Sequence, residues 1–160
     1  FKYGRIDIRA RLPVQTGMWP ALWMLGNDIG SKGWPYCGEI DIMELVGKNP
    51  KQVVGSFHWK NDDASEGTIN NRYDLTAGDF SQDFHLYSLV WGKDQYQILV
   101  DNKVYVTAKP SDIKAAYNPF NHPFYLIFNV AVGGDWPGSP DGSTSFPQKM
   151  LVDYVRVYQQ

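Results

Sequence analysis

Residues 5 to 12 read Arg5-Ile-Asp-Ile-Arg-Ala-Arg-Leu12, in which charged and apolar side chains alternate without interruption. Successive side chains of a β-strand point to opposite faces of a sheet, so this stretch predicts a strand with one dry face and one wet face. The four apolar side chains, at positions 6, 8, 10 and 12, then belong to a protein core. The acid and the arginines between them face water.

Eight further strands are expected from similar runs that are separated by Gly, Pro, Asn and Asp. The Val100-Asp-Asn-Lys-Val104 stretch indicates a tight hairpin, and Ser111 to Tyr117 is the helical candidate, ending before Pro119. This succession fits an all-β fold, an antiparallel two-sheet sandwich of jelly-roll type with one concave side. The eight strands are expected at Ala21–Leu25, Glu39–Val46, Val53–Trp59, Phe84–Trp91, Tyr96–Val100, Val104–Ala108, Phe124–Val132 and Leu151–Tyr158.

The composition indicates one domain. A chain of 160 residues is long enough for a substantial core and short for two, so residues 1–160 are expected to form a single domain. The net charge of -2 gives no electrostatic reason to expect nucleic acid or an anionic membrane as a partner. No apolar run approaches the roughly 20 residues of a membrane span, and no signal peptide is expected from this sequence. Cys37 is the only cysteine, so no internal disulfide is expected and a small buried filler is the better interpretation.

The segment Gly38-Glu-Ile-Asp-Ile-Met-Glu-Leu-Val-Gly47 carries three acids among apolar residues, where an unpaired buried charge would be costly. In a regular strand Glu39 and Asp41 share one face, and Glu44 turns to the other. A one-residue bulge near Met43 would return Glu44 to the acidic face. The sequence therefore predicts a bulged strand that gathers three carboxyl groups on one side.

Two nearby carboxyl groups are what retaining glycosidases need, about 5 to 5.5 Å apart, one to attack the anomeric carbon and one to protonate the leaving oxygen. A third carboxyl between them would push their pKa values apart, so that an acid and a nucleophile coexist at one pH. A solvated acidic strand face and a calcium cluster remain open as interpretations of such a triplet. Surroundings rich in tryptophan, tyrosine and glycine favour a carbohydrate cleft.

Five blocks in order, reaching well beyond the acidic triplet, resemble the family 16 glycoside hydrolases of the laminarinase type. The resemblance covers essentially the whole chain but aligns only to the later part of such enzymes, so the opening strands of the family's sandwich are not expected among these residues. The jelly-roll topology is what this resemblance implies. The blocks are Phe1-Lys-Tyr-Gly-Arg-Ile-Asp-Ile-Arg-Ala-Arg-Leu-Pro13, Gly17-Met-Trp-Pro-Ala-Leu-Trp-Met-Leu25, Trp34-Pro-Tyr-Cys-Gly-Glu-Ile-Asp-Ile-Met-Glu44, Asn129-Val-Ala-Val-Gly-Gly-Asp-Trp136 and Met150-Leu-Val-Asp-Tyr-Val-Arg-Val-Tyr158.

The resemblance also assigns roles to residues. It implies that Glu39 is the nucleophile, Glu44 the general acid/base and Asp41 the residue that tunes them. It implies that Trp34 and Trp136 are cleft tryptophans on which glucose rings stack. Composition alone would place both tryptophans in an ordinary sandwich core.

Two further positions match the family with alternatives left open. His58 matches a histidine that lies beside the acid/base in such enzymes, and a structural histidine is the alternative. Asp153 matches a calcium ligand near the C-terminus, but one carboxylate is a poor site because calcium takes 6 to 8 oxygens. A structural calcium ion and a solvated strand residue both remain open for Asp153. The chemistry itself is expected to need no cofactor.

The activity that the resemblance implies is internal hydrolysis of β-1,3-glucan with retained configuration, through a covalent glycosyl-enzyme that water later opens. The alternatives are a hydrolase or transglycosylase of mixed-linkage glucan or galactan on the same fold, and a non-catalytic β-glucan-binding module. Sulfated galactans call for basic residues in the cleft, and the arginines form no obvious cluster in the sequence. Secretion is expected because a glucan polymer does not cross a membrane. The oligomeric state is open, although unpaired sheet edges would favour self-association.

Overall fold

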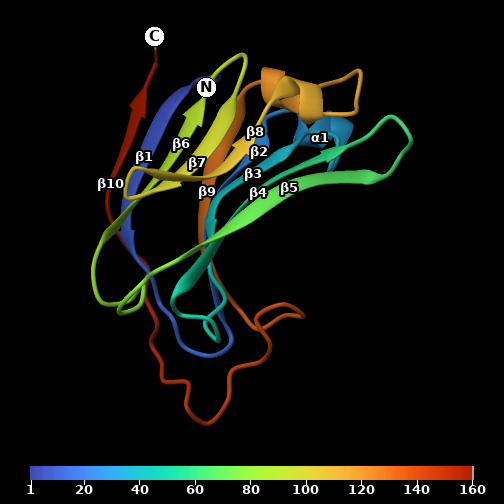
Figure 1. The fold of residues 1–160 in the computed structure, drawn as a ribbon. Coiled ribbons are helices and arrows are strands. Elements are labelled where there is room, and N and C mark those ends of the chain that lie inside the picture. Colours follow the sequence, from blue (N-terminus) through green and yellow to red (C-terminus); the bar gives the residue numbers. More distant parts are fainter. Residues whose placement is uncertain (160) are drawn as a thin grey trace.

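The computed structural model describes residues 1–159 and consists of two antiparallel five-stranded sheets packed face to face (Figure 1). One sheet has the strand order β10-β1-β6-β7-β8 and is called the β1 sheet; the other has the order β5-β4-β3-β2-β9 and is called the β3 sheet. The predicted all-β two-sheet sandwich is confirmed. The strands are β1 (Gly4–Arg11), β2 (Met18–Gly26), β3 (Glu39–Glu44), β4 (Gln52–Lys60), β5 (Glu66–Asp74), β6 (His85–Trp91), β7 (Tyr96–Val100), β8 (Lys103–Ala108), β9 (Phe124–Val132) and β10 (Leu151–Tyr158), with α1 at Ile29–Lys32 and 3₁₀ turns at Pro110–Asp112 and Pro119–Asn121.

The core lies between the two sheets. Ile6, Ile8 and Ala10 on the predicted dry face of β1 are at most 1% exposed. From the other sheet β3 contributes Ile40 and Ile42 to the same buried cluster. Burying an aliphatic side chain of this size contributes about 1.5–3 kcal/mol, so the alternation in the sequence decides which face of each central strand turns inward.

The sequence did not predict β5, because among its side chains only those of Ile69 and Tyr73 are apolar and pack against the core. It pairs with β4 along its whole length, from Gln52 opposite Asp74 to Lys60 opposite Glu66, and most of its side chains are exposed. An edge strand needs a partner's hydrogen bonds more than it needs an apolar face. Rules that search for alternating apolar residues therefore pass over it.

The helical prediction for Ser111 to Tyr117 is wrong. Only its start is helical, in the 3₁₀ turn over Pro110–Asp112. The carboxylate of Asp62 accepts the backbone N–H of Ala116 at 3.0 Å, and the N–H of Asp62 donates to the carbonyl of Lys114 at 3.0 Å. These contacts hold the segment extended against the β4–β5 turn, and so short a segment nucleates a helix poorly by itself. Among residues 1–159, no helix combines the length and apolar character needed to cross a lipid bilayer.

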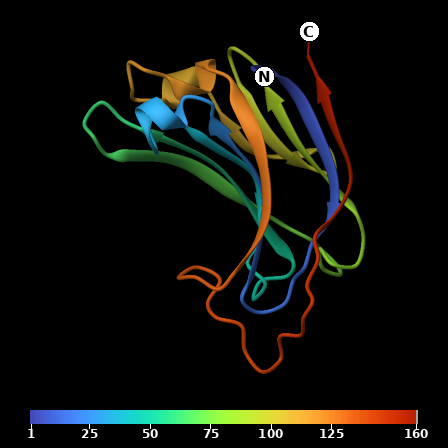
Figure 2. The ribbon, with the colours of Figure 1, turned by 180° about the vertical axis from the view of Figure 1, so that it is seen from behind.

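The edge strands β9 and β10 leave apolar side chains exposed. Val155 and Val157 of β10 lie opposite the core-facing residues Ile8 and Ile6, yet they are 39% and 41% exposed. Val132, at the end of β9, is 55% exposed. Figure 2 shows the long segment between β9 and β10 passing below both sheets. The core is therefore open to solvent along these two edges.

Candidate active site

The predicted bulge in β3 is confirmed. On the neighbouring strand β4, Asp41 lies opposite Ser56 and Glu44 lies opposite Val54, so three steps along β3 correspond to two along β4. The extra residue is Ile42, because on the β2 side the residues before and after it both have partners. A single inserted residue re-aims the side chains that follow it. It turns Glu44 to the same face of the sheet as Glu39 and Asp41, where all three line one hollow.

The bulge is held from the opposite sheet by Tyr105 of β8. The Tyr105 hydroxyl donates a hydrogen bond to the carbonyl oxygen of Ile42 at 3.1 Å. Gly55 on β4 makes room for it, since a Cβ atom there would lie 2.6 Å from the hydroxyl oxygen. A buried carbonyl without a donor costs about 1–3 kcal/mol. Tyr105 therefore stabilises the bulge, and sequence patterns cannot reveal the contact because the two residues are 63 positions apart.

Each outer carboxylate is oriented by a tryptophan. The indole Nε1 of Trp34 donates to Oε2 of Glu39 at 3.0 Å, and Nε1 of Trp19 donates to Oε1 of Glu44 at 3.0 Å. Asp41 lies between the two glutamates on the strand and is 3% exposed. An indole nitrogen is only a donor, so both glutamates keep a fixed orientation with one oxygen engaged.

His58 of β4 lies beside the first two acids of the triplet. Its ring stands across from Glu39 in the strand register, and its Nε2 is 3.3 Å from Oδ2 of Asp41. On its other side Nδ1 lies 3.1 Å from both the Glu66 carboxylate and the Thr68 hydroxyl. Its closest contact in the triplet is thus with Asp41 rather than with Glu44, although His58 and Glu44 line the same hollow.

The crowding of these groups shifts their pKa values upward. Burial, with a smaller contribution from the charge of Asp41, raises the pKa of Glu39 to about 7. The same two causes, in the same order, raise the pKa of Glu44 to about 8. Burial lowers the pKa of His58, but the Asp41 carboxylate, 3.3 Å from its Nε2, outweighs this effect and raises the pKa to about 9. Near neutral pH the site therefore holds a cationic histidine and a protonated Glu44.

Tryptophans form the walls around these acids. Trp136 is 38% exposed and packs edge to face on Trp19, with ring centroids 5.4 Å apart, while Trp34 is 49% exposed. Trp23 donates its indole N–H to Asn129 at 2.8 Å and closes the second hollow. The two adjoining hollows have volumes of about 350 and 230 Å³.

Sequence reasoning missed Trp19 and Trp23 as site residues. They lie two positions before and two positions after Ala21, in the run Trp19-Pro-Ala-Leu-Trp23, and strand alternation would have placed both on the face of Ala21. That alternation could have identified both tryptophans as site residues once the strand register was known. The register places Ala21 opposite Glu44, so Trp19 and Trp23 lie on the same face as the acids.

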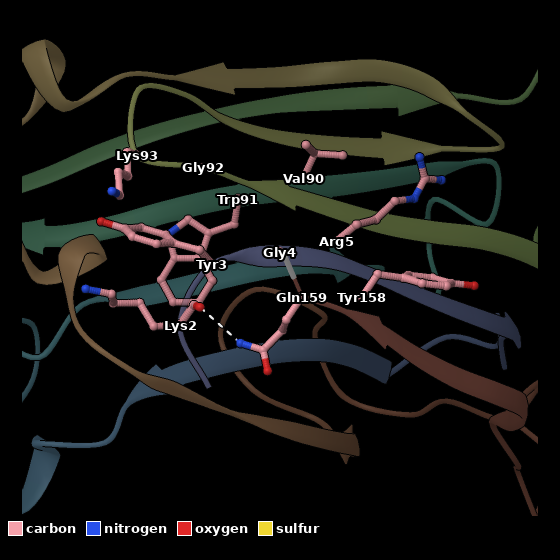
Figure 3. Close-up of a pocket in the computed structure, with 10 residues that line it drawn as sticks. All are labelled: Lys2, Tyr3, Gly4, Arg5, Val90, Trp91, Gly92, Lys93, Tyr158 and Gln159. Carbon is pink, nitrogen blue, oxygen red and sulfur yellow. Dashed lines mark hydrogen bonds between the residues drawn. The ribbon is translucent and has the colours of Figure 1, made fainter.

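Another hollow, larger than either acidic hollow, lies at the ends of β1, β6 and β10 (Figure 3). Its volume is about 690 Å³. Arg5 in its wall is already bound to Asp7 at 2.8 Å, and Gln159 donates to the Lys2 carbonyl at 3.2 Å. Among residues 1–159, no carboxyl group lines it. Its volume exceeds that of each acidic hollow, but its described lining lacks the clustered carboxyl groups that the acidic hollows contain. The acidic cleft is therefore the candidate active site.

Asp153 lies on β10, away from the acid cluster, and pairs with Arg9 at 2.7 Å. Within residues 1–159, the one group of at least three carboxylate and imidazole ligands close enough for a metal ion is Glu39, Asp41 and His58. Asp153 therefore belongs to no such ligand group among residues 1–159, whereas calcium takes 6 to 8 oxygen ligands. A structural calcium ion at Asp153 stays a prediction.

Comparison with known proteins agrees with this geometry. The model of the glycosyl hydrolases family 16 matches residues 1–156. The chain is 42% identical to glucan endo-1,3-beta-glucosidase A1 of Niallia circulans, over 99% of this chain and 24% of the relative. It is also 42% identical to the beta-glucanase of Rhodothermus marinus, over 98% of this chain and 57% of the relative.

A solved structure shows the same arrangement of strands. The laminarinase catalytic domain of Thermotoga maritima MSB8 superposes with a TM-score of 0.91 at 47% identity, over 100% of this chain and 65% of that domain. The present chain thus spans between about a quarter and two thirds of the length of the proteins that it matches. From the family match, the sequence identities and the shared fold together, this chain belongs to the glycosyl hydrolases family 16.

Proposed function

We propose that this chain hydrolyses internal β-1,3 linkages of a laminarin-type glucan and retains the anomeric configuration. The observation that carries the proposal is the bulge at Ile42, which turns Glu44 to the face of Glu39 with Asp41 between them. Retaining glycosidases use two carboxyl groups on one face of the site, one that attacks the anomeric carbon and one that protonates the glycosidic oxygen. The endo-1,3-glucanase names of the similar proteins support the choice of substrate.

Glu39 acts as the nucleophile and Glu44 as the acid in the first step. The Glu39 carboxylate attacks the anomeric carbon while Glu44 gives its proton to the glycosidic oxygen, and the bond between that carbon and that oxygen breaks. One glucan fragment leaves as the alcohol, and the other stays esterified to Glu39. In the second step Glu44 takes a proton from water, the water oxygen attacks the same carbon, and the Glu39 carboxylate is released.

The pKa values suit this division of roles. Glu44, with its pKa raised to about 8, keeps its proton at neutral pH and can donate it. Burial raises the pKa of Glu39 to about 7, and the charge of His58 and the Trp34 hydrogen bond oppose this rise by favouring its ionised form. Asp41, buried between them with a raised pKa, discourages both neighbours from ionising together. We expect a bell-shaped dependence of kcat/KM on pH, with limbs set by this coupled group.

The exposed tryptophans supply the sugar platforms in this proposal. Trp34 and Trp136 stand at the rim of the acid cluster with half-exposed rings, and the apolar face of a glucose ring packs well on such a surface. The reaction needs no cofactor, since carboxyl groups carry both steps. A polymeric substrate implies that the protein acts outside the cell.

The test is the release of reducing ends from laminarin, with lichenan and agarose as comparison substrates. We expect turnover of laminarin, at least 1,000-fold slower in Glu39→Gln, in line with the roughly 10³-fold or larger losses caused by removing catalytic groups. Asp94→Asn, an exposed acid in the turn after β6, is the control and should keep full activity. Tight binding of laminarin by the native chain without turnover would refute the proposal in favour of a binding module.

A further inference from the structure

Next to the hollows of the acid cluster lies a further hollow with three basic side chains in its lining. This hollow, called the basic pocket here, has a volume of about 380 Å³ and is lined by Lys48, Asn49, Pro50, Lys51, Gln52, Arg72 and Asp74. Arg72 also lines the hollow that contains Glu39 and Glu44. The basic pocket therefore adjoins the acidic cleft at Arg72.

The fold brings these residues together from two sides. Arg72 lies on the edge strand β5, opposite Val54, which in turn lies opposite Glu44. With neighbouring strands about 4.8 Å apart, the backbone of Arg72 stands about 10 Å from that of Glu44. The two lysines come from the turn between β3 and β4, which begins just after the catalytic strand and is closed by a hydrogen bond from Gln52 N to Asn49 O at 3.0 Å.

The three cations of the basic pocket have no ionic partner. Within residues 1–159, Lys48, Lys51 and Arg72 form none of the ion pairs, and all three are exposed. The one acid in the lining, Asp74, accepts a hydrogen bond from Nε2 of Gln52 at 2.9 Å. The pocket thus carries a local positive excess on a chain whose net charge is -2.

We propose that the basic pocket binds an anionic substituent, a sulfate ester or a carboxylate, carried by a sugar of the bound glucan next to the cleavage site. The inference rests on the proposed function, because it assumes a glucan in the cleft. A neutral polysaccharide offers only hydroxyl groups, for which unpaired cations are not required. Sulfate and carboxylate both present coplanar oxygen pairs to a guanidinium, and lysines add charge without demanding a fixed geometry.

The arginines alone, considered along the sequence, gave no sign of this pocket. Arg72 is isolated from the other arginines, and its two cationic neighbours are lysines about 20 positions away in the sequence. They meet only because β5 pairs with β4, and β5 itself could not be predicted from its polar residues.

The experiment compares neutral laminarin with sulfated and carboxymethylated laminarin of matched length. The quantity measured is the ratio of kcat/KM for the anionic over the neutral substrate. We expect a ratio of about fivefold at low salt, falling toward one in about 0.5 M salt because exposed charges are screened. A preference for the sulfated or for the carboxymethylated substrate identifies which anion the pocket takes.

The variant Lys48→Glu/Lys51→Glu should bring the ratio below one. The matched control, Lys93→Glu/Lys103→Glu, changes the net charge by the same amount on the β1 sheet and should leave the ratio unchanged. A ratio near one in the native protein, or an equal fall in both variants, would overturn the inference. If none of the three glucans is hydrolysed, the catalytic proposal fails, but the basic pocket can still be tested by binding. The affinity of Glu39→Gln for each glucan is then measured by calorimetry, and the ratio of anionic to neutral affinity replaces the ratio of kcat/KM.

Discussion

The contact between Tyr105 and the bulge gives the sharpest test of how the fold builds the active site. Replacing Tyr105 with phenylalanine removes one oxygen atom and leaves the Ile42 carbonyl buried without its donor at 3.1 Å. An unsatisfied buried group costs about 1–3 kcal/mol. The ring itself keeps its place in the core, including its edge-to-face contact with Tyr73 at 6.0 Å. We therefore expect the free energy of unfolding to fall by about 2 kcal/mol.

A matched control for this change lies in the same core. Tyr87 is fully buried, and its hydroxyl has no hydrogen-bond partner within residues 1–159. Tyr87→Phe removes the same oxygen atom from a site where nothing depends on it, so the free energy of unfolding should stay the same or rise. Urea denaturation followed by tryptophan fluorescence measures both variants on one scale.

The activity of the two variants completes the test. Without its carbonyl partner the bulge can relax toward a regular register, and Glu44 would then lose its place beside the glycosidic oxygen. We expect kcat on laminarin to fall about tenfold in Tyr105→Phe with KM nearly unchanged, because positioning of the acid matters in the transition state. Equal stability losses in both variants, or an unchanged kcat in Tyr105→Phe, would refute the claim that this hydroxyl holds the bulge.

Three further predictions follow from the site and the edges. Trp19→Phe removes an indole hydrogen bond that lowers the pKa of Glu44, so the basic limb of the kcat/KM profile should move to higher pH, and a shift to lower pH would contradict this. The folded-state pKa of Glu44 is raised from 4.5 to about 8. The stability that Glu44 contributes is therefore complete below pH 4.5 and is lost as pH rises through 8. Glu44→Gln cannot titrate, so the decline of Tm between these pH values, measured by calorimetry, should be flatter in this variant. Val155→Thr/Val157→Thr makes the exposed inner side of β10 more polar and should reduce concentration-dependent association in sedimentation velocity. Identical sedimentation of the native and variant chains would show that the chain does not self-associate through this edge.

Some features of the site could be predicted from the sequence because their signals are local. The alternation around Ile6 and Ile8 gave a strand and its buried face, since side-chain direction follows directly from strand geometry. The spacing of Glu39, Asp41 and Glu44 predicted the bulge, since a regular strand would bury the Glu44 carboxylate among the isoleucines at a large cost in free energy. The wrong helix at Ser111 to Tyr117 shows the limit, because the distant carboxylate of Asp62 decided that segment's backbone.

By itself the sequence determined the all-β class, the inward faces of the central strands and the identity of the three clustered acids, because each depends on neighbours within a few residues. The tertiary structure alone decided that Tyr105 holds the bulge, that Trp19 orients Glu44, and that Lys48 and Lys51 meet Arg72 beside the polar strand β5. These contacts join residues from different strands, and their energies arise only after the sheets have paired. No local pattern can carry that information, because the register between strands is set by the packing of the whole core.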